Sequence, residues 1–379
     1  MVPRSVRAWV LACALSAQIV PTVAVGQPVV HKPPVMLGAI RWDAWTQWAS
    51  ETEWAGYEKC LWPKQWHNRV PFYGKILSDD RVEVRNDTQA VIDKEIDYAV
   101  KGGLSYWAFG WYHPRGWQNA ENMTRCLDLY LKSKHRSRLK HSLILMAGVH
   151  LGPKDEWPRT VDYLVQRFKD PNYVKVLGNR PLVYWFDMDR LVPFWGSEAA
   201  AKDSLRLLRD GTKAAGLGDP YMALMCFWPQ HGVEQLNQFG LDALSAYVNP
   251  PGSENREQPY ADAVSLNRWF WEQCKQTGKP FIPTVTTGWD YRPMKLPRYP
   301  DRDPKSNWFV AATPSELTAH VAGAMAWVRQ NPSICEANTV ILYAWNELSE
   351  GGWLVPTLAE GARRLDAVRR AALGVVDSQ

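Results

Sequence analysis

Eight short apolar segments recur along the chain, and polar or amphipathic segments separate them. Within each segment the apolar residues are mostly consecutive rather than alternate, which is typical of strands that are buried on both faces of a parallel sheet. These predicted strands span residues 35–42, 104–113, 142–150, 181–188, 221–228, 241–248, 280–290 and 339–347.

The segments between the strands have helical patterns. The clearest span residues 87–101, 197–216, 260–278, 314–330 and 358–374. About eight strand–helix units in one chain predict an α/β fold, a closed (β/α)8 TIM barrel that forms a single domain. An open doubly wound sheet is the alternative, but no G-x-G-x-x-G motif follows the first strand and no P-loop occurs. We interpret residues 43–86 as a long loop after the first strand.

The first 26 residues have the pattern of a secretory signal peptide. Arg4 and Arg7 precede an apolar stretch that ends in the small residues Ala24-Val25-Gly26. We therefore expect cleavage after Gly26, a mature domain of residues 27–379, and a secreted or periplasmic protein. Cys13 leaves a lipoprotein anchor as the alternative. No later apolar run is long enough to span a bilayer.

Charge and cysteine content exclude several classes of function. Removing the leader lowers the formal charge from +5 to +3, because the leader carries two arginines and no acids. The positive residues form no basic stripe, so we expect no nucleic-acid partner. No C-x-x-C motif occurs, so we expect no zinc site; one disulfide is left open. We expect no metal and no cofactor.

The predicted strand ends carry acids and aromatic rings, and the chain has 21 tryptophans against 10 phenylalanines. Catalytic groups of a barrel lie at the C-terminal ends of its strands, and aromatic faces stack on sugar rings. We therefore predict a carbohydrate cleft. Its candidate substrate-binding residues are Trp42, Asp43, Trp111, Tyr112, His113, His150, Asp187, Trp228, Trp289, Asp290, Arg292, Asn346 and Trp353. For single members structural roles stay open: a helix cap for Asp187, packing for Trp42 and Trp111, and a mutual ion pair for Asp290 and Arg292.

Glu347 and Glu350 follow the last strand, in the string YAWNELSEGGW. Cleavage of a glycosidic bond needs one group that protonates the departing oxygen and another that acts at the anomeric side, and two carboxylates supply both. Each carboxylate raises the proton affinity of its neighbour, so one of them can stay protonated. A helix N-terminus at Glu350 is the alternative interpretation.

The strings AWNELSEGGWLVP and TTGWDYRP resemble the Asn-Glu-aromatic-x-Glu-Gly and Trp-Asp motifs of glycoside hydrolase family 99-like proteins, which include the WbsX-type polysaccharide proteins. The segments EIDYAVKGGLSYWAFGWYH and YVKVLGNRPLVYWFDM are similar to further parts of that group. The resemblance covers most of residues 35–357 and implies a (β/α)8 barrel with a retaining reaction.

The resemblance also implies roles for the two glutamates. Glu347 would be the base that assists attack by the sugar's own 2-hydroxyl, and Glu350 would be the acid and then the base. Leu348 and Ser349 depart from the family's usual residues, as does the first-strand string GAIRWDAW, so the sugar specificity stays open.

The sequence thus predicts a secreted glycoside hydrolase that acts on a polysaccharide or glycan. Two alternatives stay open: a carbohydrate-binding barrel without turnover, and a glycosyltransferase-like protein of polysaccharide assembly. An esterase is not supported, because no G-x-S-x-G motif occurs.

Overall fold

The computed structural model describes residues 34–46, 57–117, 120–295 and 306–375, and residues Val35–Gln379 form one compact unit. The predicted leader, with Arg4, Arg7, Cys13 and Gly26, lies outside the described residues. Within the described ranges no helix is both long and apolar enough to cross a membrane.

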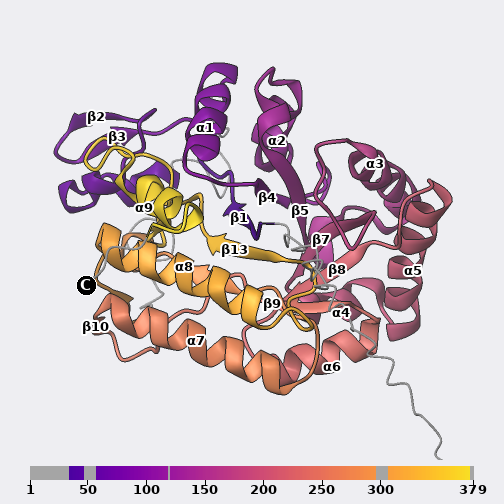
Figure 1. Ribbon diagram of the computed structural model, residues 1–379. Coiled ribbons are helices and arrows are strands. Elements are labelled where there is room, and N and C mark those ends of the chain that lie inside the picture. The colour runs from indigo at the N-terminus through magenta and orange to yellow at the C-terminus, as the bar shows by residue number, and fades with distance from the viewer. Residues whose placement is uncertain (1–33, 47–56, 118–119, 296–305, 376–379) are drawn as a thin grey trace, which may run out of the picture. The chain divides into compact units, whose positions relative to one another are not determined.

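Eight parallel strands form a nearly closed barrel, as predicted (Figure 1). They are β1 (Met36–Arg41), β4 (Tyr106–Trp111), β5 (Lys140–Met146), β7 (Arg180–Phe186), β8 (Tyr221–Met225), β9 (Ala243–Ser245), β11 (Thr284–Thr286) and β13 (Thr339–Tyr343). Strand β13 pairs with both β1 and β11. Between β9 and the segment before β11, Ile282 N donates to Leu244 O at 2.9 Å, which bridges the remaining gap.

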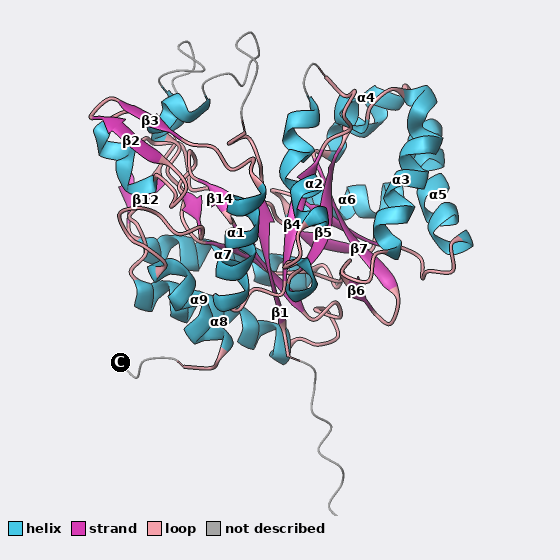
Figure 2. Ribbon diagram, turned by 90° about the horizontal axis from the view of Figure 1, so that it is seen from above, coloured by secondary structure: helices cyan, strands magenta, loops and turns pink. Residues whose placement is uncertain are grey.

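A helix follows each barrel strand, and the helices surround the strands (Figure 2). They are α1 (Gln89–Lys101), α2 (Arg125–Lys132), α3 (Trp157–Lys169), α5 (Glu198–Ala214), α6 (Pro229–Phe239), α7 (Tyr260–Gln276), α8 (Pro314–Gln330) and α9 (Arg363–Ala372), with a short α4 (Leu191–Trp195) before α5. Helix α8 shows how the sequence determines where a helix begins. Thr313 and Glu316 form a reciprocal capping box, and Pro314 occupies the first turn.

The remaining short strands lie outside the barrel. They are β2 (Lys75–Ser78), β3 (Arg81–Glu83), β6 (Lys175–Val176), β10 (Glu257–Gln258), β12 (Trp308–Phe309), β14 (Asn346–Glu347) and β15 (Gly352–Trp353). The prediction of residues 43–86 as one loop was wrong in part, because the described portion contains two 3-10 helices and the β2–β3 hairpin. The predicted last strand also divides, since β13 ends at Tyr343 and Glu347 belongs to β14.

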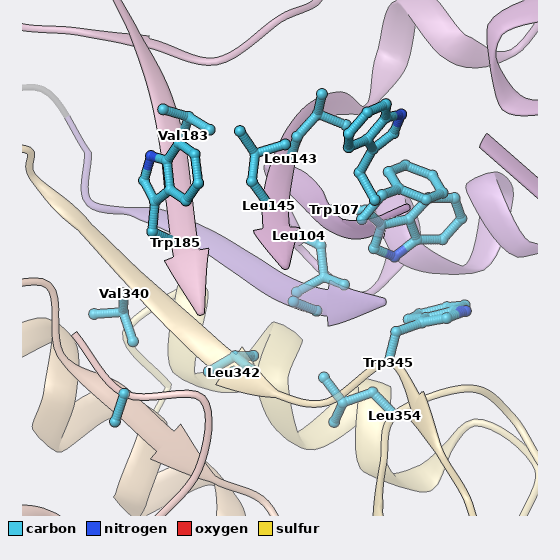
Figure 3. Packing of buried hydrophobic residues seen from close by; sticks show 14 of the residues in the cluster. Leu104, Trp107, Leu143, Leu145, Val183, Trp185, Val340, Leu342, Trp345 and Leu354 are labelled. Atoms are coloured by element: carbon cyan, nitrogen blue, oxygen red, sulfur yellow. The ribbon is translucent and has the colours of Figure 1, made fainter. Parts of the chain in front are cut away.

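Alternation along the strands divides the core in two. Ile341 and Tyr343 of β13 point into the barrel, whereas Val340 and Leu342 face the helices. Figure 3 shows this outer row on neighbouring strands, with Val183 and Trp185 beside Leu143 and Leu145. Five cysteines of the described ranges are buried, and the disulfide left open by the sequence does not form between any two of them.

Candidate active site

The two glutamates lie in a small hairpin at the C-terminal end of the barrel. Glu347 pairs with Gly352 across the β14–β15 ladder, and Glu350 occupies the turn between these strands. The turn is not a helix, so the alternative interpretation of Glu350 as a helix N-terminus is wrong. Gly351 has a φ of 84°, and an added Cβ would lie 2.5 Å from the Asp290 nitrogen, so only glycine fits this approach.

Two tyrosines from different strands orient the two carboxylates. The Tyr247 hydroxyl, two residues after β9, donates to Glu347 Oε1 at 2.5 Å. The Tyr343 hydroxyl, at the end of β13, donates to Glu350 Oε2 at 2.6 Å. The two tyrosine rings lie 5.6 Å apart and meet edge to face. Closure of the barrel therefore brings both carboxylates and both phenols into one cluster, which we call the acid–tyrosine cluster.

The electrostatics of this cluster favour a proton on Glu347. Burial raises the pKa of Glu347 well above its ordinary range, the charge of Glu350 raises it further, and the hydrogen bond from Tyr247 opposes the shift. Glu347 is only 3% exposed, and its Oε2 atom has no hydrogen-bond partner among the described residues. Burial also raises the pKa of Tyr247 and of Tyr343, so both phenols stay neutral donors.

A buried ionic network fixes the start of the hairpin. Arg41 at the end of β1 donates to Asp43 at 3.0 Å and to Glu95 of α1 at 2.8 Å. The Asn346 side chain donates to Asp43 and accepts from the backbone nitrogen of Trp42. Asp43 and Asn346, both predicted to bind substrate, are therefore engaged in holding β1 against the hairpin.

A second network holds the loop after β11 against the same hairpin. The Arg292 guanidinium makes two hydrogen bonds to Asp290, at 2.8 and 3.0 Å, and Arg69 donates to the same carboxylate. Asp290 N donates to Glu350 O at 2.7 Å. The Trp353 ring lies against the guanidinium groups of Arg69 and Arg364. Asp290 and Arg292 therefore pair with each other, which the sequence had left open.

Three of the predicted residues form one contact group at the ends of β1, β4 and β5. Trp42 Nε1 donates to the Tyr112 hydroxyl at 2.9 Å, and the ring centroids of Tyr112 and His150 lie 5.4 Å apart. Burial lowers the pKa of His150 to about 4, with Arg190 adding to the shift, so the imidazole is neutral at neutral pH.

Two predicted residues have side chains that point away from the barrel interior. Trp111 stacks on Tyr163 of α3 with ring centroids 5.9 Å apart, and His113 lies 3.7 Å from Glu156. Both line a separate cavity of about 400 Å³ between the strand end and the helices. Strand alternation explains this, because Trp111 points to the opposite side from Gly110 and Tyr112. The structure therefore does not bring Trp111 and His113 together with the glutamates.

The other predicted residues lie at the remaining strand ends. Asp187 has a left-handed backbone and pairs with Arg190 at 2.6 Å, without capping a helix through its side chain. Trp289 donates to Ser306, and its ring lies 6.1 Å from that of Tyr343. Trp228 is 66% exposed. The described residues contain no group of three or more His, Cys, Asp or Glu side chains arranged to hold a metal ion.

Sequence reasoning missed Tyr247 and Tyr343. Both lie in apolar segments and read as core residues, although Tyr343 is four residues before Glu347. Inward alternation of Thr339, Ile341 and Tyr343 is the signal that could have found the second tyrosine. Nothing in the sequence pairs Tyr247 with Glu347, because 100 residues separate them.

Comparisons with known proteins agree on the fold. The model of a family described as glycosyltransferase WbsX matches residues 132–368. A solved GH99 endo-alpha-mannosidase from Bacteroides thetaiotaomicron is 14% identical, with a TM-score of 0.53 over 89% of this chain and 95% of its own. A second structure of that enzyme is also 14% identical and gives a TM-score of 0.55 over 89% and 96%.

A solved protein described as glycoside hydrolase-like is 12% identical, with a TM-score of 0.60 over 92% of this chain and 97% of its own. A comparison with curated proteins finds no match. At these identities the structural likeness establishes the barrel fold alone, and the chemistry has to be argued from the site.

Proposed function

The chain belongs to the WbsX family, and on this premise we propose that it is a glycoside hydrolase in which Glu347 and Glu350 cleave a glycosidic bond of a polysaccharide or glycan. The observation that carries the proposal is the arrangement of the acid–tyrosine cluster. Each carboxylate has one oxygen that accepts a hydrogen bond from a tyrosine hydroxyl. Glu347 Oε2 is buried without a partner among the described residues, where a sugar hydroxyl would satisfy it.

The proposed division of labour follows from the chemistry of the bond. Glu350 protonates the departing oxygen and later takes a proton from water. Glu347 accepts a proton from the sugar's 2-hydroxyl, so that the 2-oxygen attacks the anomeric carbon and a strained three-membered ring forms as the glycosidic bond breaks. Water then opens this ring at the anomeric carbon, and Glu347 returns its proton to the 2-oxygen and so restores the hydroxyl. Two inversions retain the configuration.

The raised pKa of Glu347 has a direct consequence for this scheme. In the unliganded protein, burial and the charge of Glu350 favour the protonated form of Glu347. The scheme requires the proton on Glu350 and a charged Glu347, and hydroxyl donors of a bound sugar at Oε2 stabilise that charge. Substrate binding thus moves the proton from the base to the acid, and a strongly basic Glu347 then takes the 2-hydroxyl proton effectively.

Digestion of a polysaccharide panel tests the proposal. The mature protein, residues 27–379, is incubated with mannans, glucans, xylans, galactans and bacterial exopolysaccharides, and products are identified by mass spectrometry. We expect products from the wild type and none from Glu347→Gln or Glu350→Gln, with circular dichroism showing that both variants fold. If the protein binds glycans without forming products, and both variants bind them equally well, the hydrolase proposal is wrong and the alternative of a carbohydrate-binding barrel without turnover stands.

The family description favours transfer as a second candidate. The same pair can pass the glycosyl unit to an acceptor hydroxyl instead of water. Reaction in ¹⁸O-labelled water separates the two, because hydrolysis places the label at the new reducing end and transfer to a sugar does not.

We also propose that the protein acts outside the cytoplasm, because the first 26 residues have the pattern of a secretory leader. Expression of the full chain with N-terminal sequencing of the product tests this. A mature protein in the periplasm or medium that begins at Gln27 supports it, and a cytoplasmic protein that retains residues 1–26 contradicts it.

A further inference from the structure

A groove that follows β8 collects every exposed aromatic ring in the described part of the chain. Among the phenylalanines, tyrosines and tryptophans of these ranges, only Phe227, Trp228 and Trp269 are exposed, at 46%, 66% and 46%. All three line one open groove of about 590 Å³. Exposure of large apolar side chains to water is unfavourable. Three of them around one groove therefore indicate a binding surface.

The groove is built from three elements whose positions the barrel fixes. Phe227 and Trp228 follow β8, and Trp269 projects from α7 with Phe270 as part of the floor. The third wall is residues 249–253. Figure 1 shows α6 and α7 as neighbours at this side of the barrel.

The third wall is held in place before any ligand binds. Asn249 Oδ1 accepts from Asn267 at 2.9 Å, and Gly252 O accepts from Asn307 N at 2.8 Å. Pro250 and Pro251 restrict the backbone between these two points. A preformed wall lowers the entropy cost of binding.

The groove adjoins the acid–tyrosine cluster. Phe186 packs against Tyr247, the partner of Glu347, with ring centroids 5.0 Å apart. On its other side Phe186 packs against Phe227 with centroids 5.9 Å apart. Asn249 lies two residues after Tyr247 in the chain. A glycan seated at the carboxylates therefore needs to extend by only a few sugar units to reach Trp228.

The chemistry of the lining fits a sugar chain. The negative face of an indole attracts the slightly positive C–H groups on the apolar face of a pyranose ring. Neither the Trp228 nor the Trp269 indole nitrogen has a hydrogen-bond partner among the described residues, and the same holds for the Asn249 side-chain nitrogen, so these donors are available to hydroxyls. The lining thus combines aromatic faces with a few polar groups, as carbohydrate subsites require.

We infer that this groove is a remote subsite that holds a unit of the glycan chain, away from the bond that is cut, between Trp228 and Trp269. The inference rests on the proposed function, because the occupant is the substrate of the Glu347–Glu350 pair. It adds that the substrate is a chain of several sugar units.

Binding to a glycan microarray that carries mannans, glucans, xylans, galactans and their oligosaccharides of increasing length tests the inference. The measurement uses the Glu350→Gln protein, so that cleavage does not remove the probe. We expect binding that rises with chain length, and a loss of about tenfold or more in affinity when Trp228→Ala and Trp269→Ala are combined. Replacing both tryptophans by phenylalanine retains the ring faces and should keep most of the affinity.

The surface variant Leu207→Ala, on α5, is the control and should bind as the parent does. Length-independent binding, or equal binding by the double alanine variant, would overturn the inference, and so would the absence of any bound glycan. Self-association in the ultracentrifuge that the double alanine variant removes would make the groove an interface between copies, which also overturns it.

Failure of the proposed function gives a different result. If glycans bind through the groove and no bond is ever cleaved, hydrolysis fails and the sugar-binding groove stands. If long chains are cleaved and the double alanine variant cleaves them with unchanged KM, hydrolysis stands and the subsite fails.

Discussion

At the scale of single residues, the two oxygens of Glu347 have different surroundings. Tyr247 holds Oε1, whereas Oε2 has no partner among the described residues. The hydrogen bond lowers a pKa that burial and Glu350 raise. The phenol therefore sets how much of the base is charged at a given pH.

Tyr247→Phe should accordingly change the pH dependence of the reaction. A base works in its charged form, so the rate rises as pH increases through the pKa of Glu347. In the substrate complex, where Glu347 is the charged member of the pair, loss of the hydrogen bond raises that pKa and moves the acid limb of the kcat profile to higher pH, with a rate loss of about tenfold or more at neutral pH. Steady-state kinetics across pH would check this.

Tyr106→Phe is the matched control, because it removes a buried hydroxyl that bonds Tyr184 and Thr339 deep in the barrel. It should cost about 1 kcal/mol of stability and leave the pH profile in place. An acid limb that moves to lower pH in Tyr247→Phe would contradict the role of Glu347 as the base.

At the scale of elements, the loop after β11 depends on one carboxylate. Burial alone would raise the pKa of Asp290, but the hydrogen bond from Arg292 and the charges of Arg69 and Arg292 hold it below its ordinary value. Because the folded-state pKa is depressed, this group stabilises the protein fully above its unfolded pKa of about 4. The stabilisation is lost as pH falls through the lowered folded value.

Asp290→Asn should therefore destabilise the protein by about 3 kcal/mol at neutral pH, because two arginines lose their charged partner. Urea unfolding at several pH values would show a smaller difference from wild type below pH 4. Glu83→Gln, which breaks an exposed pair with Lys75, should change stability by less than about 1 kcal/mol. An Asp290→Asn protein as stable as wild type would show that the ion pairs of Asp290 with Arg69 and Arg292 contribute nothing to stability.

The tie between α1 and the barrel gives another prediction. Glu95 is fully buried and accepts from Arg41 and from Trp345 Nε1. Glu95→Ala leaves the Arg41 charge with Asp43 alone and should cost about 3–5 kcal/mol. Asp203→Ala, which removes one partner of a surface pair on α5, should cost about 0.5 kcal/mol or less in the same unfolding assay. Equal effects of the two variants would contradict the network.

At the scale of the whole molecule, the sequence predicted the barrel well and the site only in part. Consecutive apolar residues identified all eight strands, because a strand that is buried on both faces needs apolar side chains at nearly every position. The contacts of Asp43 and Asn346 were not predictable, since they depend on β13 closing the ring against β1. The local sequence pattern does not show which distant strands become neighbours.

The tryptophans illustrate the same limit. Trp228 ends one predicted strand and Trp353 follows another by six residues, and both were predicted to bind substrate. One is 66% exposed in the groove, and the other is 3% exposed between two arginines. Only the fold separates a ring that can meet a sugar from a ring that supports a loop.

The central claim is that Glu347 and Glu350 form a catalytic pair with different roles, and one kinetic comparison tests it most directly. Glu347→Ala and Glu350→Ala would be assayed on the natural glycan and on the glycosyl fluoride of the same sugar, whose leaving group needs no proton. We predict that Glu347→Ala fails on both substrates and that Glu350→Ala fails on the glycan but cleaves the fluoride. Cleavage of the glycan by both variants at the wild-type rate would contradict the claim.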